Sequence, residues 1–158
     1  MEAVPELKDV FATLDANFPG LVKENVGIGS TIFAVKPGDG SAREQAASCQ
    51  KVLGGWANIA KEYATKRYRS NTINWGMLPF LFDGDDKALP FKNGDYIIVP
   101  NIAAAVRDKV QNITAHVIYN EASGAYEAPA EINLKLGELT DDERKIILAG
   151  CLINYYRE

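Results

Sequence analysis

The sequence contains few of the residues that build metal centres or disulfide frameworks. Its 158 residues include two cysteines, Cys49 and Cys151, and one histidine, His116. An iron–sulfur cluster needs several thiolates brought together, whereas these cysteines lie far apart in helix-like segments. We therefore expect no metal site in this chain and two unpaired, buried cysteines. A Ser-His-Asp triad is also disfavoured, because His116 alternates with Ala115 and Val117 in a predicted strand and is expected to be structural.

The chain also lacks an excess of basic residues and any long apolar run. Its 17 Lys and Arg residues against 21 Asp and Glu residues give a net charge of −4, which provides no electrostatic footprint for nucleic acid. No apolar run approaches the roughly 20 residues that a membrane-spanning helix needs, and residues 1–5 show no signal-peptide pattern. We expect a cytoplasmic protein with neither a nucleic-acid partner nor a membrane partner, in a compartment that keeps both cysteines reduced.

No repeat, low-complexity tract or linker divides the sequence, so residues 1–158 are predicted to form a single domain. An acidic loop at 83–86 lacks the spacing of an EF-hand and is expected to be a solvated turn. Periodicity and turn residues predict an amphipathic helix over 6–16, a buried strand over 28–35, a helix over 42–52, a strand over 56–60, a polar helix over 61–70, a strand over 96–99, a hairpin of 112–119 with 126–136 around Ser123-Gly124, and a last helix that starts at Thr140 with a Thr140–Glu143 capping box. This order predicts an α/β domain with a mixed sheet or open barrel and helices packed outside.

The most informative segment is the glycine-rich turn that precedes the second predicted helix. Gly38-Asp39-Gly40 delivers Ser41 to the helix start, and Arg43 follows within the first turn. Ser41 and Glu44 fit the S-x-x-E spacing of a capping box. A helix start has free N–H groups and partial positive charge, so a hydroxyl and a guanidinium there form a candidate carboxylate site. The local pattern leaves a second interpretation open, in which Ser41 only caps the helix and Arg43 is solvated.

The wider sequence favours the first interpretation. The segment Gly40-Ser41-Ala42-Arg43-Glu44-Gln45-Ala46-Ala47 resembles the Gly-Ser-Ser-Arg-Glu-His-Ala-Ala motif of the aconitase family, in its mobile C-terminal swivel domain. The resemblance continues through Leu53-Gly54-Gly55 and resumes in Arg69-Ser70-Asn71-Thr72-Ile73-Asn74-Trp75-Gly76-Met77-Leu78-Pro79. The spacing between these motifs makes the match specific. It implies the swivelling β/β/α fold of that family, in agreement with the predicted elements.

The resemblance implies reversible dehydration and rehydration of a hydroxy-polycarboxylate. It assigns the base to Ser41, whose alkoxide the helix start would stabilise. It assigns the binding of the substrate carboxylate to Arg43, and it places Gly40 and Ala42 in the same substrate-binding turn. Two departures from the motif bear on specificity: Ala42 stands where the family has its second Ser, and Gln45 stands where it has His.

The family's cluster cysteines lie in other domains, so the resemblance implies a [4Fe-4S] cluster outside this chain. Three interpretations follow. The chain is expected to be a swivel domain, a fragment of a larger iron–sulfur-dependent hydro-lyase that supplies the base and is inactive alone. Alternatively, it is a separate small subunit, as in isopropylmalate dehydratase, and binds a large subunit. The third interpretation is a non-catalytic binding or regulatory module that keeps the fold; Ala42 and Gln45 favour it, and the retained Ser41 and Arg43 oppose it.

Overall fold

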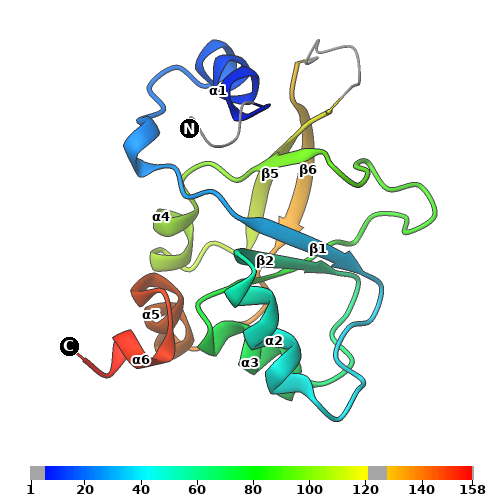
Figure 1. The fold of residues 1–158 in the computed structure, drawn as a ribbon, viewed down its shortest axis with the longest axis vertical. Coiled ribbons are helices and arrows are strands. Elements are labelled where there is room, and N and C mark those ends of the chain that lie inside the picture. The colour runs from blue at the N-terminus through cyan, green and yellow to red at the C-terminus, as the bar shows by residue number, and fades with distance from the viewer. Residues whose placement is uncertain (1–5, 121–127, 158) are drawn as a thin grey trace.

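A computed structural model of the protein describes residues 6–120 and 128–157 (Figure 1). The elements in chain order are α1 (Glu6–Asn17), the 3-10 helix η1 (Lys23–Asn25), β1 (Ser30–Ala34), α2 (Arg43–Val52), β2 (Gly55–Ala60), α3 (Lys66–Asn74), β3 (Leu78–Leu81), β4 (Tyr96–Ile98), α4 (Ile102–Arg107), β5 (Asn112–Ile118), β6 (Ala130–Lys135), α5 (Asp141–Ala149) and α6 (Leu152–Tyr155). Figure 1 shows α2 and α3 packed beside one part of the sheet and α1 beside the other.

Six strands form one open mixed sheet in the order β1-β2-β3-β6-β5-β4. The first three strands are parallel, with Ile59 opposite Phe80, and the last three are antiparallel. A single antiparallel pair, Leu81 with Lys135, joins the two halves. The architecture confirms the predicted α/β class with a mixed, unclosed sheet and helices packed outside.

The main core crosses the seam between these halves. Ile59 and Phe80 of the parallel half pack in one cluster with Ile113 and Leu134 of the antiparallel half, and α4 adds Val106. This shared core compensates for the sparse backbone pairing between β3 and β6, because buried apolar area stabilises the fold by about 25 cal/mol per Å². A smaller cluster contains the buried residues of α1, namely Val10, Phe11 and Leu14, together with Ile118 of β5.

The structure corrects four local predictions. The strand over 28–35 is shorter and is an exposed edge strand, because nothing pairs with the outer side of β1 in the described sheet. The predicted helix over 61–70 begins only at Lys66 and continues to Asn74. Cys49 is exposed rather than buried, and Cys151 is half-buried; both are free thiols. The start of α2 also differs from prediction, as described below.

Other predictions are confirmed. Thr140 caps α5 and forms the full capping box with Glu143. β5 and β6 pair antiparallel as predicted, although Ser123-Gly124 lies outside the described residues. The half-buried ring of His116 meets Phe18 edge-on, with ring centroids 5.0 Å apart, and its structural role stays a prediction.

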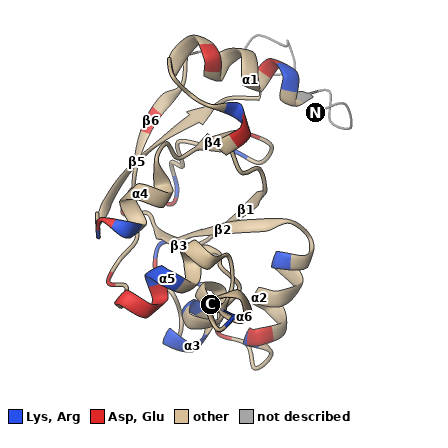
Figure 2. Cartoon of the chain, turned by 90° about the vertical axis from the view of Figure 1, so that its left-hand side faces the viewer, with Lys and Arg blue, Asp and Glu red and all other residues tan. Residues whose placement is uncertain are grey.

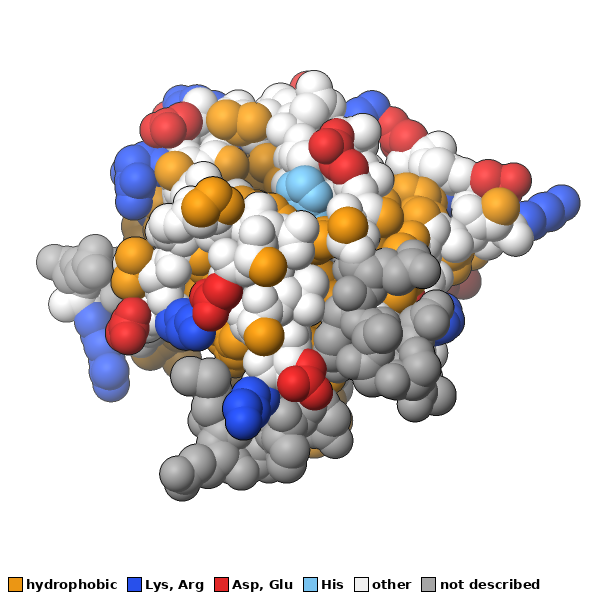
Figure 3. Space-filling model, turned by 90° about the horizontal axis from the view of Figure 1, so that it is seen from above, with side chains coloured by type: hydrophobic (Ala, Val, Ile, Leu, Met, Phe, Trp, Pro, Cys, Tyr) orange, Lys and Arg blue, Asp and Glu red, His pale blue; other side chains and the backbone are white. Residues whose placement is uncertain are grey.

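Acidic and basic side chains are interspersed over the molecule. Figure 2 shows both signs of charge on α1, α2 and α5. Seen from above, the surface mixes apolar side chains with charges of both signs (Figure 3). Over residues 6–120 and 128–157, no helix is long and apolar enough to cross a membrane.

Candidate functional site

The glycine-rich turn after β1 opens onto a cavity of about 370 Å³. The turn, the first residues of α2 and one side chain of α3 line this cavity: Gly38, Gly40, Ser41, Ala42, Arg43, Ala46 and Tyr68. The structure therefore brings together the four residues that the sequence singled out, Gly40 to Arg43. It adds Tyr68, which lies 25 residues after Arg43 in the chain.

The start of α2 differs from the predicted capping box. The helix begins at Arg43, and its N-cap is Ala42, whose side chain makes no capping hydrogen bond. This register places Glu44 at the second helical position instead of the third, where a capping box needs it. Its carboxylate instead accepts a hydrogen bond of 3.2 Å from Nε1 of Trp75. The prediction that Ser41 caps the helix is therefore wrong: Ser41 is an exposed residue one position further out.

The start of α2 keeps polar groups that are free to bind an anion. The first N–H groups of a helix have no intrahelical acceptor, and α2 has no side-chain cap to satisfy them. These N–H groups carry the partial positive charge of the helix start, which favours the binding of anions. The hydroxyl of Ser41 stands beside these groups at the cavity rather than being used as a cap.

Arg43 supplies a second group suited to an anion. The residue is half-buried, and its Nε is a buried donor without a hydrogen-bond partner among the described residues. Leaving a buried donor unsatisfied costs about 1–3 kcal/mol. A carboxylate is the kind of acceptor that suits this side chain, because a guanidinium and a carboxylate form short, charge-assisted hydrogen bonds.

The turn is fastened to the start of α3. The backbone N–H of Ala64 donates to the carbonyl of Pro37 at 2.9 Å. The hydroxyl of Thr65 donates to the carbonyl of Gly38 at 3.2 Å and also caps α3 by accepting from the N–H of Tyr68. Gly38 has φ +96°, and a Cβ there would lie 2.4 Å from the Cβ of Tyr68. Only glycine fits this close approach in a left-handed conformation.

A buried chain of polar side chains fixes the far side of Tyr68. Its hydroxyl accepts a hydrogen bond of 3.0 Å from Nδ2 of Asn58 in β2. Oδ1 of Asn58 accepts from Nε2 of Gln50 in α2, which also donates to the carbonyl of Ala57 at 3.1 Å. Asn58 is completely buried and Tyr68 is 4% exposed. Sequence analysis missed Tyr68 and Asn58; the glycine at 38 was the one available sign that a bulky side chain lay close to the turn.

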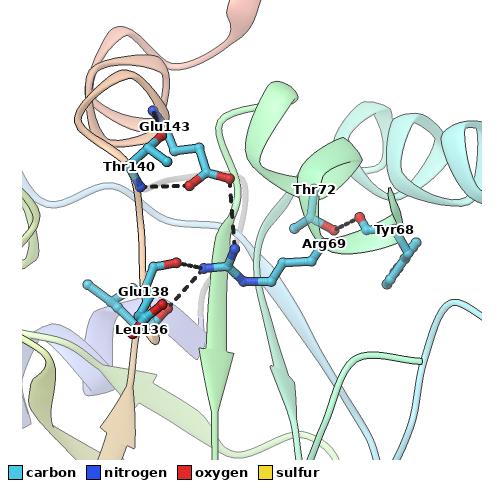
Figure 4. Close-up of polar contacts among 7 residues, drawn as sticks. All are labelled: Tyr68, Arg69, Thr72, Leu136, Glu138, Thr140 and Glu143. Carbon is cyan, nitrogen blue, oxygen red and sulfur yellow. Dashed lines mark hydrogen bonds and ion pairs between the residues drawn. The ribbon is translucent and has the colours of Figure 1, made fainter. Parts of the chain in front are cut away.

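The residue after Tyr68 connects α3 to the segment between β6 and α5. Figure 4 shows Arg69 pointing away from Tyr68, toward the connection between β6 and α5. Its Nη2 donates to the carbonyls of Glu138 at 2.7 Å and Leu136 at 3.4 Å. Its Nη1 lies 3.8 Å from Oε1 of Glu143, the same carboxylate that completes the capping box of α5. Arg69 thus holds α3, and with it Tyr68, in a fixed position against the sheet.

The described residues do not fit a metal cluster. Residues 6–120 and 128–157 contain no group of three or more His, Cys, Asp or Glu side chains that could hold a metal ion. Neither Cys49 nor Cys151 lines the cavity. The groups at the cavity with chemistry suited to an anion are Arg43 and the start of α2.

Comparison with known proteins places this chain in a family. The family model described as the aconitase C-terminal domain matches residues 23–85, a range that includes the turn, α2, Asn58 and Tyr68. The chain is 32% identical over 148 residues to the methanogen homoaconitase small subunit of Methanocaldococcus jannaschii, covering 93% of this chain and 71% of that subunit. It is 30% identical over 128 residues to aconitate hydratase A of Rickettsia prowazekii, covering 80% of this chain but 14% of that enzyme.

The open α/β sheet and the turn at the cavity define a domain of the aconitase C-terminal type. With the similarity to the homoaconitase small subunit, the chain belongs to the aconitase family.

Proposed function

We propose that this chain is the substrate-binding and base-supplying component of a hydro-lyase that acts on a hydroxy-polycarboxylate. The observation that carries the proposal is that Arg43, whose Nε is a buried donor without a partner among the described residues, lines the same cavity as the exposed residue Ser41. The names of the two relatives support the reaction class, since one is a homoaconitase subunit and the other an aconitate hydratase.

In this proposal Arg43 and the N–H groups at the start of α2 hold one substrate carboxylate. A planar guanidinium can bind a carboxylate through two hydrogen bonds, and this bidentate contact orients the carbon next to that carboxylate toward Ser41. The alkoxide form of Ser41 accepts the proton from that carbon and becomes a hydroxyl, and the electron pair of the C–H bond forms the double bond. Hydroxide leaves the neighbouring carbon for an electrophile that the partner would supply. A serine oxygen is a weak base unless its anion is stabilised, and the uncapped start of α2 supplies a suitable positive field.

The cluster that the family implies would come from outside the described residues, and it would supply a Lewis acid for the leaving hydroxide. We propose that a cluster-bearing partner completes the site and that this chain alone has no turnover. The first relative supports a separate large subunit as that partner, because the match extends over most of a small subunit. The alternative is that further domains of one longer chain carry the cluster, with residues 1–158 as one swivel domain. A cytoplasmic location is part of the same proposal.

The binding half of this proposal can be tested on the chain alone. Tricarballylate, a tricarboxylate without a hydroxyl group, is titrated into ¹⁵N-labelled protein, and the dissociation constant is measured from the shifts of the amides of residues 40–43. Arg43→Gln should weaken binding about 10- to 100-fold, the equivalent of one lost charge-assisted interaction. Arg67→Gln is the matched control, because Arg67 is an exposed arginine of α3 that does not line the cavity. Equal affinity in the two variants would contradict the proposed site.

A further inference from the structure

We infer that Tyr68 is a positioning residue that holds the turn of residues 37–42 in its binding geometry. The inference rests on the proposed function, because it concerns the same cavity. Tyr68 acts through the turn and through Arg43, and no chemical step is assigned to its hydroxyl.

The turn is anchored to α3 and to the residues just before it. Its contacts with α3 come from its first residues: Pro37 and Gly38 accept hydrogen bonds from Ala64 and Thr65. Gly38 also lies against the side chain of Tyr68 so closely that no larger residue fits. Ser41 follows three residues later, so the position of its hydroxyl depends on where Tyr68 holds Gly38.

Tyr68 itself has a fixed position. Its ring is buried, and its hydroxyl is bound to Asn58, which is in turn bound to Gln50. A buried amide such as that of Asn58 has a strong preference for one geometry, because an unpaired amide group in the interior is costly. The tyrosine ring therefore has little freedom to shift beneath the turn.

The same polar side chains connect the two helices that line the cavity, α2 and α3. Gln50 lies in α2, two helical turns after Arg43, at 3.6 residues per turn. Tyr68 lies in α3, and Asn58 in β2 connects them. The side chains of Gln50, Asn58 and Tyr68 thus link α2, which carries Arg43, to α3, which anchors the turn that carries Ser41. Misplacement of such groups by about 1 Å is enough to reduce the efficiency of a site strongly.

Two substitutions of Tyr68 separate the hydroxyl from the ring. Tyr68→Phe keeps the surface against Gly38 but leaves Nδ2 of Asn58 without its acceptor. Tyr68→Leu removes the surface as well. Both variants should lower the melting temperature, so a thermal melt alone does not test the inference. Val117→Ala is the matched control, because it creates a cavity in the core among residues that do not line the site.

The test is tricarballylate affinity together with hydrogen exchange of the amides of residues 40–43. We expect the dissociation constant to rise at least ~3-fold in Tyr68→Phe and at least ~10-fold in Tyr68→Leu, with faster exchange in the turn. Val117→Ala should bind like the wild type despite its lower melting temperature. Unchanged affinity and exchange in Tyr68→Phe would overturn the inference even if Tyr68→Leu failed to fold. If the wild type itself did not bind tricarballylate, the proposed function would fail instead.

Discussion

At the scale of single residues, a shift of one position in the start of α2 changes the role of Ser41. Ser41 and Glu44 have the spacing of a capping box, yet the helix begins one residue later than that spacing requires. Ala42 then takes the N-cap position, and its methyl side chain cannot accept a hydrogen bond from the first N–H groups of the helix. As a result, the hydroxyl of Ser41 and the first N–H groups of α2 are all available at the cavity. The absence of a cap at this helix is consistent with a site that binds an anion.

This register predicts that Ser41→Ala leaves folding stability nearly unchanged. An N-cap serine contributes about 1 kcal/mol, whereas an exposed residue away from such a position contributes within about 0.5 kcal/mol. Chemical denaturation of the variant and the wild type measures the difference in the free energy of unfolding. Thr140→Ala is the positive control, because Thr140 does cap its helix. A loss in Ser41→Ala as large as that in Thr140→Ala would contradict the observed register.

A second residue-scale prediction concerns Tyr63. Burial raises the pKa of the Tyr63 phenol, whose hydroxyl donates to the carbonyl of Phe80. The folded state therefore keeps this proton at a pH where the unfolded chain has lost it. The corresponding stability is complete below the unfolded pKa of about 10 and is lost as the pH rises through and above that value.

Tyr63→Phe should accordingly make the free energy of unfolding fall less steeply between about pH 9.5 and 11.5. Tyr156→Phe is the control, because Tyr156 is 78% exposed. Unfolding in urea at several alkaline pH values measures both slopes. Identical slopes in the wild type and in Tyr63→Phe would show that the phenol ionises as readily in the folded state as in the unfolded one.

At the scale of elements, α3 connects the site to the rest of the fold. Tyr68 lines the cavity, whereas the next residue, Arg69, reaches the β6–α5 connection (Figure 4). The carbonyls of Leu136 and Glu138 depend on this guanidinium for hydrogen bonds that an apolar side chain could not replace.

Arg69→Met should therefore destabilise the protein by about 1–3 kcal/mol, the cost of leaving such groups unpaired. Arg67→Met, on the exposed side of the same helix, should change the free energy of unfolding by less than about 0.5 kcal/mol. Denaturant unfolding of both variants gives the comparison. Equal stability of the two variants would mean that solvent satisfies the carbonyls of Leu136 and Glu138 and that α3 is held by apolar packing alone.

Elements with strong local signals were predictable from the sequence. The apolar periodicity of α1, the capping box of α5 and the pairing of β5 with β6 all depend on neighbouring residues. The exposure of β1 was not predictable, because its apolar composition suits a central strand and only the strand order places it at an edge. The same limit applied to the site: Ser41 and Arg43 belong to one short motif, whereas Tyr68 and Asn58 reach it only through tertiary packing.

At the scale of the whole molecule, the fold presents its site at the periphery. The cavity lies between the turn after β1, α2 and α3, all beside the parallel half of the sheet. The site supplies a hydroxyl, a guanidinium and free amides, but the described residues hold no metal cluster.

The central claim is that Ser41 is the base of the assembled enzyme. The direct measurement is steady-state kinetics of wild type and Ser41→Ala, each combined with a cluster-loaded large subunit, from the absorbance of the unsaturated product. We predict that kcat falls at least ~100-fold in Ser41→Ala with a small change in KM, because a proton acceptor is lost rather than a binding group. Near-full kcat in that variant would contradict the account and favour a non-catalytic binding module.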